Sequence, residues 1–375
     1  MIDTFKLQAT EKGIADRIWN NPIFEDYLIS TKKKKEEETV IKYKKDYKNI
    51  INLNKKGNDV FISIKLQHLY NLELGTDNAY HNASLFTATQ SINTIHHLQK
   101  LLTLNDEDLE FLKITSIELN TKIFKQNNIE ANNFINKVFK SGTRSFVSIH
   151  DIDKKFTYKE SKGSYCMDKV YNKSEQYSQY CKAGTIAIER RIEKNRNIYK
   201  LTHCKTLEDL KCLKKYTYIA KELTRFTDGI LLLDWNIDQR YSLRKLNKRE
   251  LSKINLLLRA NYWQVQTKNN HNTFSRKKKD YINLIEKIGC NIHNSFKSTV
   301  KTSLNKQLRN KNKTCKNVAK TPTKKQVKTS IKNQKNVAKT PYMIKGVNAT
   351  KTKSLQEIRA GGFENININI KNQRL

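Results

Sequence analysis

At 375 residues the chain can hold one large domain, or two smaller ones, plus a tail. Its 72 Lys and Arg against 36 Asp and Glu give a formal net charge of +36, which indicates a polyanionic partner, with nucleic acid first. Codon bias in an AT-rich genome would explain abundant Lys, Asn and Ile, but not the two-to-one excess of bases. The absence of a long apolar run argues against a membrane-spanning helix or a signal peptide.

The six cysteines argue against a structural zinc site, because none of them shows the paired spacing that such sites use. Scattered thiols of this kind are expected in a reducing cytoplasm. The sequence also has no phosphate-binding P-loop, no dinucleotide glycine motif and no nucleophile elbow. Most nucleotide hydrolases, dinucleotide enzymes and α/β hydrolases are therefore excluded.

The first 120 residues are predicted to form strands and one helix. Residues 59–66 show the strand pattern, because Val60, Ile62 and Ile64 alternate with other residues and share one face. The charge block at 32–38 is interpreted as a solvated hairpin tip or helix end and not as a site. The predicted strands cover 2–8, 40–50, 59–66 and 111–120, and the predicted helix covers 83–104.

Residues 129–240 continue with helices and strands. A helix is predicted from Thr206 to about Leu223, because Thr206 is a cap residue followed by acidic residues. Residues 229–235 are predicted to be a buried strand or a helix start. This order predicts an α+β fold with a mainly antiparallel central sheet and helices packed on one side. The other predicted elements are a helix at 129–140 and strands near 144–149, 165–172 and 184–193.

After residue 240 the pattern becomes helical. Two amphipathic helices are predicted at 248–260 and 278–289, with a basic run around the start of the second. The basic run is predicted to contact DNA, and the alternative is an ordinary helical pair that packs on the domain. Its residues are Arg276, Lys277, Lys278 and Lys279.

After residue 290 the chain becomes rich in Lys, Asn, Thr and Ser. Residues 291–375 hold 20 Lys and Arg against 2 Glu, and a seven-residue sequence at 316–322 recurs at 335–341. This composition predicts a disordered basic tail that binds nucleic-acid backbone without sequence preference, and a solubilising tail is the alternative. The predicted domains are therefore 1–240, 241–290 and 291–375.

Three residues on predicted strands are candidates for chemistry. Glu118 lies between Ile117 and Leu119, and Glu189 follows Ile188; burying a carboxylate at such positions is costly unless it is paired or bound to metal. Tyr171 can be a covalent nucleophile if a cation or base lies nearby. The alternative is an ordinary half-exposed strand pair with a tyrosine packed at its edge. Basic side chains that could hold a phosphate lie close by in sequence, namely Lys173, Arg190 and Arg191.

Five short segments follow one another along the chain: Met1-Ile2-Asp3, residues 60–66, Ile117-Glu118, Val170-Tyr171-Asn172-Lys173 and Ile188-Glu189-Arg190-Arg191. In this order they resemble the phage and plasmid replication initiation proteins of the gene II/X type, which are rolling-circle initiators of filamentous phages and related replicons. The resemblance covers roughly residues 1–240. It departs at one strand, where the family usually has Arg-Ile-Asp and this chain has Ser116-Ile117-Glu118.

The resemblance implies roles for individual residues. Tyr171 would be the nicking nucleophile, and Lys173 would contact the scissile phosphate. Glu118 and Glu189 would be ligands or supports of a Mg²⁺ or Mn²⁺ site. Arg190 and Arg191 are predicted to contact DNA because arginine can hold a phosphate.

The implied function is initiation of rolling-circle DNA replication in a bacterial cytoplasm, with residues 1–240 as the catalytic domain. The enzyme would nick one strand at the origin, form a 5′-phosphotyrosyl intermediate and rejoin the strand later, with a host helicase and polymerase as partners. A non-enzymatic protein that coats nucleic acid stays an alternative. A transposase or relaxase is a third, although the His-x-His pair of common relaxases is missing. Other possible nucleophiles are Tyr165, Tyr177 and Tyr180.

Overall fold

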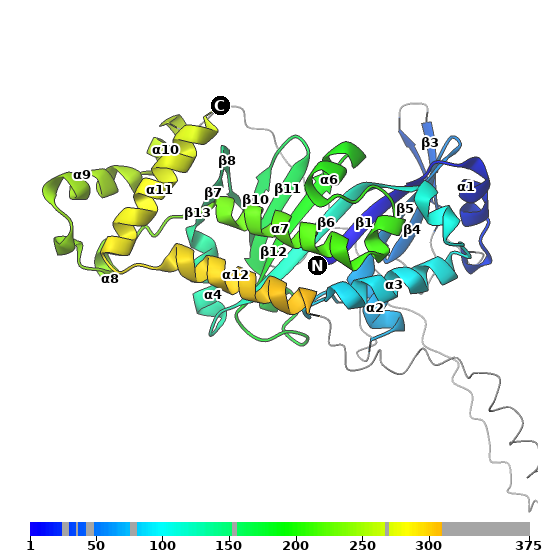
Figure 1. Cartoon of the computed structure of the whole chain (residues 1–375), viewed down its shortest axis with the longest axis horizontal. Helices are drawn as coiled ribbons and strands as arrows, with labels where there is room; N and C mark the ends of the chain where they lie inside the picture. Colours follow the sequence, from blue (N-terminus) through cyan, green and yellow to red (C-terminus); the bar gives the residue numbers. More distant parts are fainter. Residues whose placement is uncertain are drawn as a thin grey trace, which may run out of the picture. The chain divides into compact units, whose positions relative to one another are not determined.

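The computed structural model describes residues 1–24, 30–34, 37–42, 49–75, 81–151, 156–266 and 270–309 (Figure 1). The chain divides into two compact units, Met1–Asn312 and Lys313–Leu375. The second unit, and with it most of the predicted basic tail, lies outside the described residues. Residues 43–48, in the strand predicted over 40–50, lie outside them as well.

The first unit is built around an antiparallel sheet of ten strands (Figure 1). Its strands are β1 (Ile2–Ala9), β2 (Ser30–Lys34), β3 (Glu37–Lys42), β4 (Ile51–Lys56), β5 (Asp59–Lys65), β6 (Leu112–Phe124), β9 (Val147–Asp151), β10 (Phe156–Lys162), β11 (Cys166–Asn172) and β12 (Thr185–Glu193). They lie in the order β2-β3-β4-β5-β1-β6-β12-β11-β10-β9. Two meanders therefore flank the central pair of β1 and β6. The sheet brings β1, β6 and the consecutive strands β11 and β12 side by side, although these three parts are far apart in sequence.

One face of the sheet is covered by helices. The helices of the first unit are α1 (Lys12–Trp19), α2 (Leu66–Glu73), α3 (Ala88–Leu101), α4 (Asn128–Lys137), α5 (Lys173–Gln176), α6 (Asn195–Thr202), α7 (Leu213–Gly229), α8 (Ile237–Arg240), α9 (Lys248–Leu257), α10 (Ala260–Gln266), α11 (His271–Lys287) and α12 (Ile292–Leu308). Of these, α6, α7 and α12 contact β6 directly, and Figure 1 shows them in front of the sheet.

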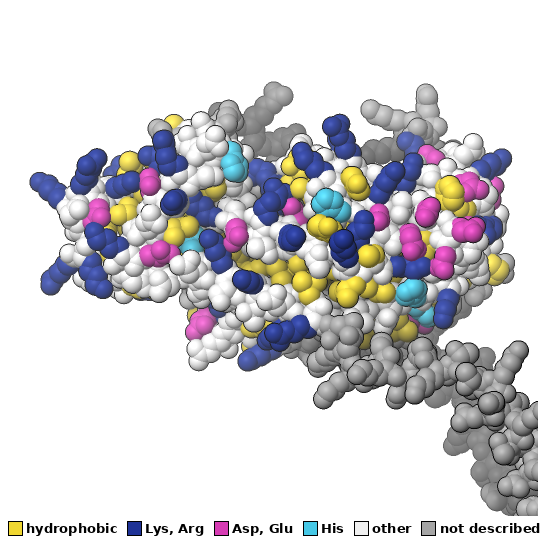
Figure 2. Space-filling view, in the orientation of Figure 1, with side chains coloured by type: hydrophobic (Ala, Val, Ile, Leu, Met, Phe, Trp, Pro, Cys, Tyr) yellow, Lys and Arg dark blue, Asp and Glu magenta, His cyan; other side chains and the backbone are white. Residues whose placement is uncertain are grey.

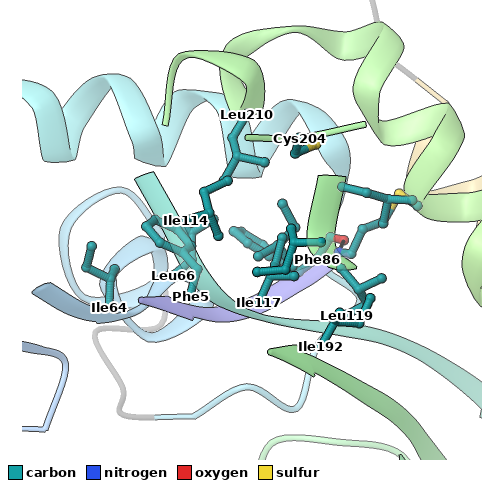
Figure 3. Close-up of a cluster of buried hydrophobic side chains, with 14 of the residues drawn as sticks. Phe5, Ile64, Leu66, Phe86, Ile114, Ile117, Leu119, Ile192, Cys204 and Leu210 are labelled. Atoms are coloured by element: carbon teal, nitrogen blue, oxygen red, sulfur yellow. Dashed lines mark hydrogen bonds between the residues drawn. The ribbon is translucent and has the colours of Figure 1, made fainter. Parts of the chain in front are cut away.

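The main hydrophobic core lies between this helical layer and the sheet. The strands alternate as predicted, so Phe5 and Ile64 point into the core together with Leu119. Figure 3 draws these side chains in one buried cluster with Phe86 and Leu210, and Leu210 enters the cluster from above the sheet. Alternate residues of the central strands are mostly apolar and face the core. The residues between them are mostly polar and lie on the other face of the sheet.

A second hydrophobic cluster joins α9, α10 and α11 to a small sheet. This sheet has the order β13-β7-β8, from β7 (Val138–Ser141), β8 (Arg144–Ser145) and β13 (Ile230–Leu232). Trp263 is fully buried in the cluster and its indole N–H donates to the carbonyl of Leu257 at 2.6 Å. Helices α9, α10 and α11 thus pack against the domain through an apolar core of their own.

The predicted fold class is confirmed, but several boundaries differ. Strand β10 was not predicted, and the predicted helix 129–140 ends at Lys137 and gives way to β7. The predicted start of a disordered tail at residue 291 is wrong for residues 292–308, which form α12 and bury Phe296, Val300 and Leu304 in the main core. These residues recur every four positions, the helical period, within a segment otherwise rich in Lys, Ser and Thr.

In the part of the chain that the structure describes, none of the helices combines the length and the apolar character needed to cross a membrane.

Candidate active site

A cleft of about 390 Å³ opens on the face of the sheet that the helical layer leaves uncovered. We call it the carboxylate cleft, because Asp3, Glu118 and Glu189 line it, together with Tyr171 and Lys173. Each of the four adjacent central strands contributes one of these side chains, and Lys173 follows directly at the start of α5. The cleft therefore depends on the sheet order and not on any single segment of sequence.

Strand alternation decides which residues of β12 reach the cleft. Glu189 and Arg191 lie on the cleft face, while Arg190 between them points to the helical face. In the register of the sheet, Arg191 stands opposite Glu118 on β6, and Lys169 stands opposite Glu189 on β11. Opposite charges face each other across neighbouring strands in both pairs, which stabilises this register.

The hydroxyl of Tyr171 is held at both sides. It donates a hydrogen bond to Glu189 Oε1 at 2.6 Å and accepts one from Lys173 Nζ at 2.7 Å. Its ring packs against Phe156 with 5.3 Å between centroids. Burial and the neighbouring Glu189 carboxylate raise the pKa of the phenol well above its ordinary value, and burial lowers the pKa of Lys173.

Three carboxylates form a group beside this tyrosine. Asp3, Glu118 and Glu189 each offer an oxygen, and these oxygens lie within 4.8 Å of one another. Asp3 reaches the group because the pairing of β1 with β6 shifts register between Ile2 and Thr4. Such a bulge turns the extra residue away from the face that simple alternation would give it.

The environment of Glu118 shows how the three carboxylates interact. The guanidinium of Arg191 donates to Glu118 Oε2 from Nε at 3.0 Å and from Nη2 at 2.7 Å. Burial, followed by the charges of Glu189 and Asp3, nevertheless raises the pKa of Glu118 to about 7. The positive charge of Arg191 is therefore not enough to offset the burial of Glu118 and its repulsion by the two neighbouring carboxylates.

The group has the chemistry of a site for a hard divalent cation. All three candidate ligands are carboxylates, which suit Mg²⁺ and Mn²⁺, and neither histidine nor cysteine belongs to the group. Asp3 accepts a hydrogen bond from the Asn82 amide on Oδ2, whereas its buried Oδ1 has no hydrogen-bond partner among the described residues. An uncompensated buried oxygen facing two further carboxylates fits a cation at this position.

We expect the affinity for Mn²⁺ to decrease as the pH is lowered, because the Glu118 carboxyl becomes protonated. A carboxyl with a pKa of about 7 is mostly protonated at pH 6, and a cation must displace that proton. Binding at pH 6 should therefore be about tenfold weaker than at pH 8, which titration calorimetry measures. The variant Glu118→Gln should bind more weakly but lose this pH dependence, and an unchanged dependence would contradict the assignment.

The structure brings five of the predicted residues together: Tyr171, Lys173, Glu118, Glu189 and Arg191. Of the basic run on α11, Arg276 and Lys279 are exposed and Lys277 is half-buried. Lys278 is buried and donates to the backbone carbonyl of Asp228. All four lie on α11 and none lines the carboxylate cleft.

Arg190 was predicted to contact DNA, and it lies away from the cleft among acidic partners. It is 7% exposed, with Nε 3.5 Å from Asp168 and Nη1 3.4 Å from Glu222. Its guanidinium also lies 4.6 Å from the centre of the Phe226 ring. The pKa of Arg190 is raised, as these two carboxylates outweigh the effect of burial.

The buried ion pairs of Arg190 predict a large effect on stability. Arg190→Met should lower the free energy of unfolding by about 3 to 5 kcal/mol, because it leaves Asp168 and Glu222 with one fewer buried cation. Arg225→Met is the matched control. Its side chain is 63% exposed and pairs with the same Glu222, so it should cost less than about 1 kcal/mol. Urea denaturation measures both, and equal losses would contradict this role.

The sequence-based prediction missed the role of Asp3 in the cleft and named Tyr177, which also lines it, only as an alternative nucleophile. Asp3 was quoted as part of the resemblance but not as a ligand, although it follows an apolar residue on a strand as Glu118 does. Tyr177 lines the cleft, and its ring centre lies 4.9 Å from Lys173 Nζ. Among the other tyrosines considered, Tyr180 stacks on His81 and Tyr165 lines a different cleft.

Comparisons with known proteins give little beyond this geometry. No protein-family model matches the sequence, and no curated protein matches it. A solved structure of the rolling circle replication initiator protein from Geobacillus stearothermophilus aligns with 60% of this chain and 84% of that chain, at 10% identity and a TM-score of 0.35. A structural similarity this distant carries no weight for function or for individual residues.

Proposed function

We propose that this protein initiates rolling-circle replication by nicking and rejoining one DNA strand with Tyr171 as the nucleophile. The observation that carries the proposal is the Tyr171 hydroxyl, held between Glu189 and Lys173 beside two further carboxylates. A nucleophile with a proton acceptor on one side and a cation on the other is the arrangement that covalent catalysis requires. The choice of DNA as the substrate, and of a replication origin as the site of cleavage, rests on the resemblance in motif order.

The chemical steps follow from the two hydrogen bonds. Glu189 takes the phenol proton while the Tyr171 oxygen bonds to phosphorus, and the bond from phosphorus to the 3′ oxygen breaks. The 3′ oxygen takes up a proton from solvent water and leaves as a free hydroxyl, and the phosphate remains on Tyr171 as a 5′-phosphotyrosyl ester. Lys173 stabilises the phenolate. In the reverse direction the 3′-hydroxyl attacks this ester, so rejoining needs no nucleotide cofactor.

Asp3, Glu118 and Glu189 would hold the divalent cation, Mg²⁺ or Mn²⁺. When bound, such a cation polarises a phosphoryl oxygen and lowers the cost of negative charge near the reacting phosphorus. Two of these carboxylates also have a basic partner: Arg191 forms an ion pair with Glu118, and Lys173 Nζ lies 4.0 Å from Glu189. Burial and the bare carboxylates raise the pKa of Tyr171, and this pKa should fall once the charge of the carboxylates is compensated.

Further parts of the proposal concern DNA and its other partners. Lys6, Lys65 and Lys169 line the cleft with Arg191 and would contact backbone phosphates of the nicked strand. Arg276, Lys277 and Lys279 on α11 would bind duplex DNA outside the carboxylate cleft, and the tail would add affinity that depends on salt. The free 3′-hydroxyl would prime a host polymerase, with a host helicase opening the duplex, in the bacterial cytoplasm.

The test is a search for the covalent intermediate. Supercoiled plasmid that carries the gene's own flanking DNA is incubated with the protein and Mn²⁺, and the products are digested and analysed by mass spectrometry. We expect nicked circles with a nucleotide attached to the peptide that contains Tyr171, and none when the cation is removed by EDTA. Salt-sensitive binding without any adduct, under each of several cations, would reject the proposal and favour the coating protein.

A further inference from the structure

A second and larger cleft, of about 770 Å³, lies between the β7–β8 turn, the end of α7, and helices α11 and α12. Arg190 lines it from the helical face of β12, whereas Glu189 and Arg191 line the carboxylate cleft from the opposite face. The two clefts therefore lie on opposite faces of the sheet. We call the second one the basic cleft, after its lining side chains Arg144, Arg190, Arg225, Lys278, Lys279 and Lys297.

The arginines of the basic cleft are already paired. Arg144 Nη2 lies 2.6 Å from Asp168, and Arg190 and Arg225 share Glu222 at 3.4 and 2.8 Å. Because each arginine forms an ion pair with a carboxylate, the three arginines contribute little uncompensated positive charge to the cleft. Their role in the cleft is to hold its shape.

The lysines of the basic cleft are not paired in this way. Within the described part of the chain, no carboxylate forms an ion pair with Lys278, Lys279 or Lys297, and Asp228 is the one acidic residue in the lining. Burial and the charge of Lys297 lower the pKa of Lys278 to about 8, so the two amines repel each other. Lys278 uses one of its N–H groups on the Asp228 carbonyl and keeps others available.

Three uncompensated amines around one cavity call for an anionic ligand. The cavity is several times larger than one phosphate needs, and Ser141 and Thr143 in its lining add neutral hydroxyl donors. Exposed Arg276 continues the positive surface along α11. Figure 2 shows Lys and Arg side chains gathered over the part of this face formed by α9, α10 and α11. A ligand with several phosphates in a row fits better than a single ion.

We propose that the basic cleft is a second nucleic-acid site, which holds backbone phosphates of a DNA segment other than the strand in the carboxylate cleft. The choice of DNA as the polyanion rests on the proposed function. Since the sheet separates the two clefts, the bound segment can stay in place while the strand at Tyr171 is cut and rejoined. The basic cleft then affects affinity for DNA and leaves the chemical step unchanged.

The test uses the full chain and a duplex of about 25 base pairs in EDTA, so that no cleavage takes place. Lys279→Gln with Lys297→Gln removes two exposed charges from the basic cleft. Lys301→Gln with Lys306→Gln removes the same charge from exposed positions on α12 outside the cleft and is the matched control. The affinity of each protein is measured by fluorescence anisotropy over a range of salt concentrations.

We expect the cleft pair of variants to weaken binding about tenfold at moderate salt and to lower the salt slope by about 2, because each phosphate contact contributes about 0.9 to that slope. The control pair should leave both values near those of the unchanged protein. Equal losses in both pairs would overturn the proposal, since binding would then follow total charge. No loss in the cleft pair would overturn it as well.

Lysine acetylation, read by mass spectrometry of the unmodified full chain, supplies an independent measurement. Bound duplex should protect Lys279 and Lys297 and leave Lys301 and Lys306 reactive. Protection by inorganic phosphate or a nucleoside triphosphate, without protection by duplex, would reassign the cleft to a small ligand and overturn the proposal. Because these experiments measure binding only, a failure of the nicking assay would not change their outcome.

Discussion

Replacing Tyr171 with phenylalanine should abolish the covalent protein–DNA adduct and lower strand cleavage by about 10⁴-fold or more. The substitution removes the nucleophilic oxygen and nothing else, because the phenylalanine ring can keep the packing of Tyr171 against Phe156. Lys173 retains a hydrogen bond to Gln176 at 3.1 Å. The loss of one buried hydroxyl should cost about 1 kcal/mol of unfolding free energy, so the variant should stay folded.

Tyr177→Phe is the matched control for this experiment, because Tyr177 lines the same cleft and its ring also faces Lys173. It should form the adduct at a rate close to that of the unchanged protein. Quenched reactions separated on denaturing gels, with labelled DNA, measure both variants. If Tyr171→Phe retained the adduct and Tyr177→Phe lost it, the proposed nicking activity would be supported, but its nucleophile would be Tyr177.

Replacing Glu189 with glutamine should slow cleavage by about 10³-fold at saturating Mn²⁺. Glutamine keeps an oxygen that can accept the hydrogen bond of Tyr171, but it cannot take the phenol proton. It also removes one candidate cation ligand, so the Mn²⁺ concentration needed for half-maximal activity should rise. Two separate effects are therefore expected, one on the rate and one on the cation requirement.

A titration with Mn²⁺ distinguishes these two roles of Glu189. If the residue only held the cation, high Mn²⁺ would restore the rate of the variant, and the role of proton acceptor would be contradicted. Glu193→Gln provides the control. It makes the same change of charge on the same strand, at an exposed position outside the cleft, and should leave both the rate and the cation requirement unchanged.

Hydrophobic periodicity was enough to predict the fold class and most strands. Apolar residues at every second position predicted β5 and β12, since such a segment must bury one face. The same rule places Arg190 and Arg191 on opposite faces, so the sequence already implied that the two arginines do not line the same cleft. Strand β10 was missed because its pattern, Phe-Thr-Tyr-Lys-Glu-Ser-Lys, has few apolar residues and is stabilised by pairing with β9 and β11.

The sequence alone determined which side chains could act: Tyr171, Lys173, Glu118 and Glu189 are recognisable by residue type and by their strand neighbours. Only the tertiary structure decided that they meet, because the strand order that joins β1, β6, β12 and β11 is set by pairing between distant segments. Asp3 is the clearest case. Simple alternation would assign it to the core face with Phe5, and the bulge in its pairing with β6 turns it toward Glu118 and Glu189.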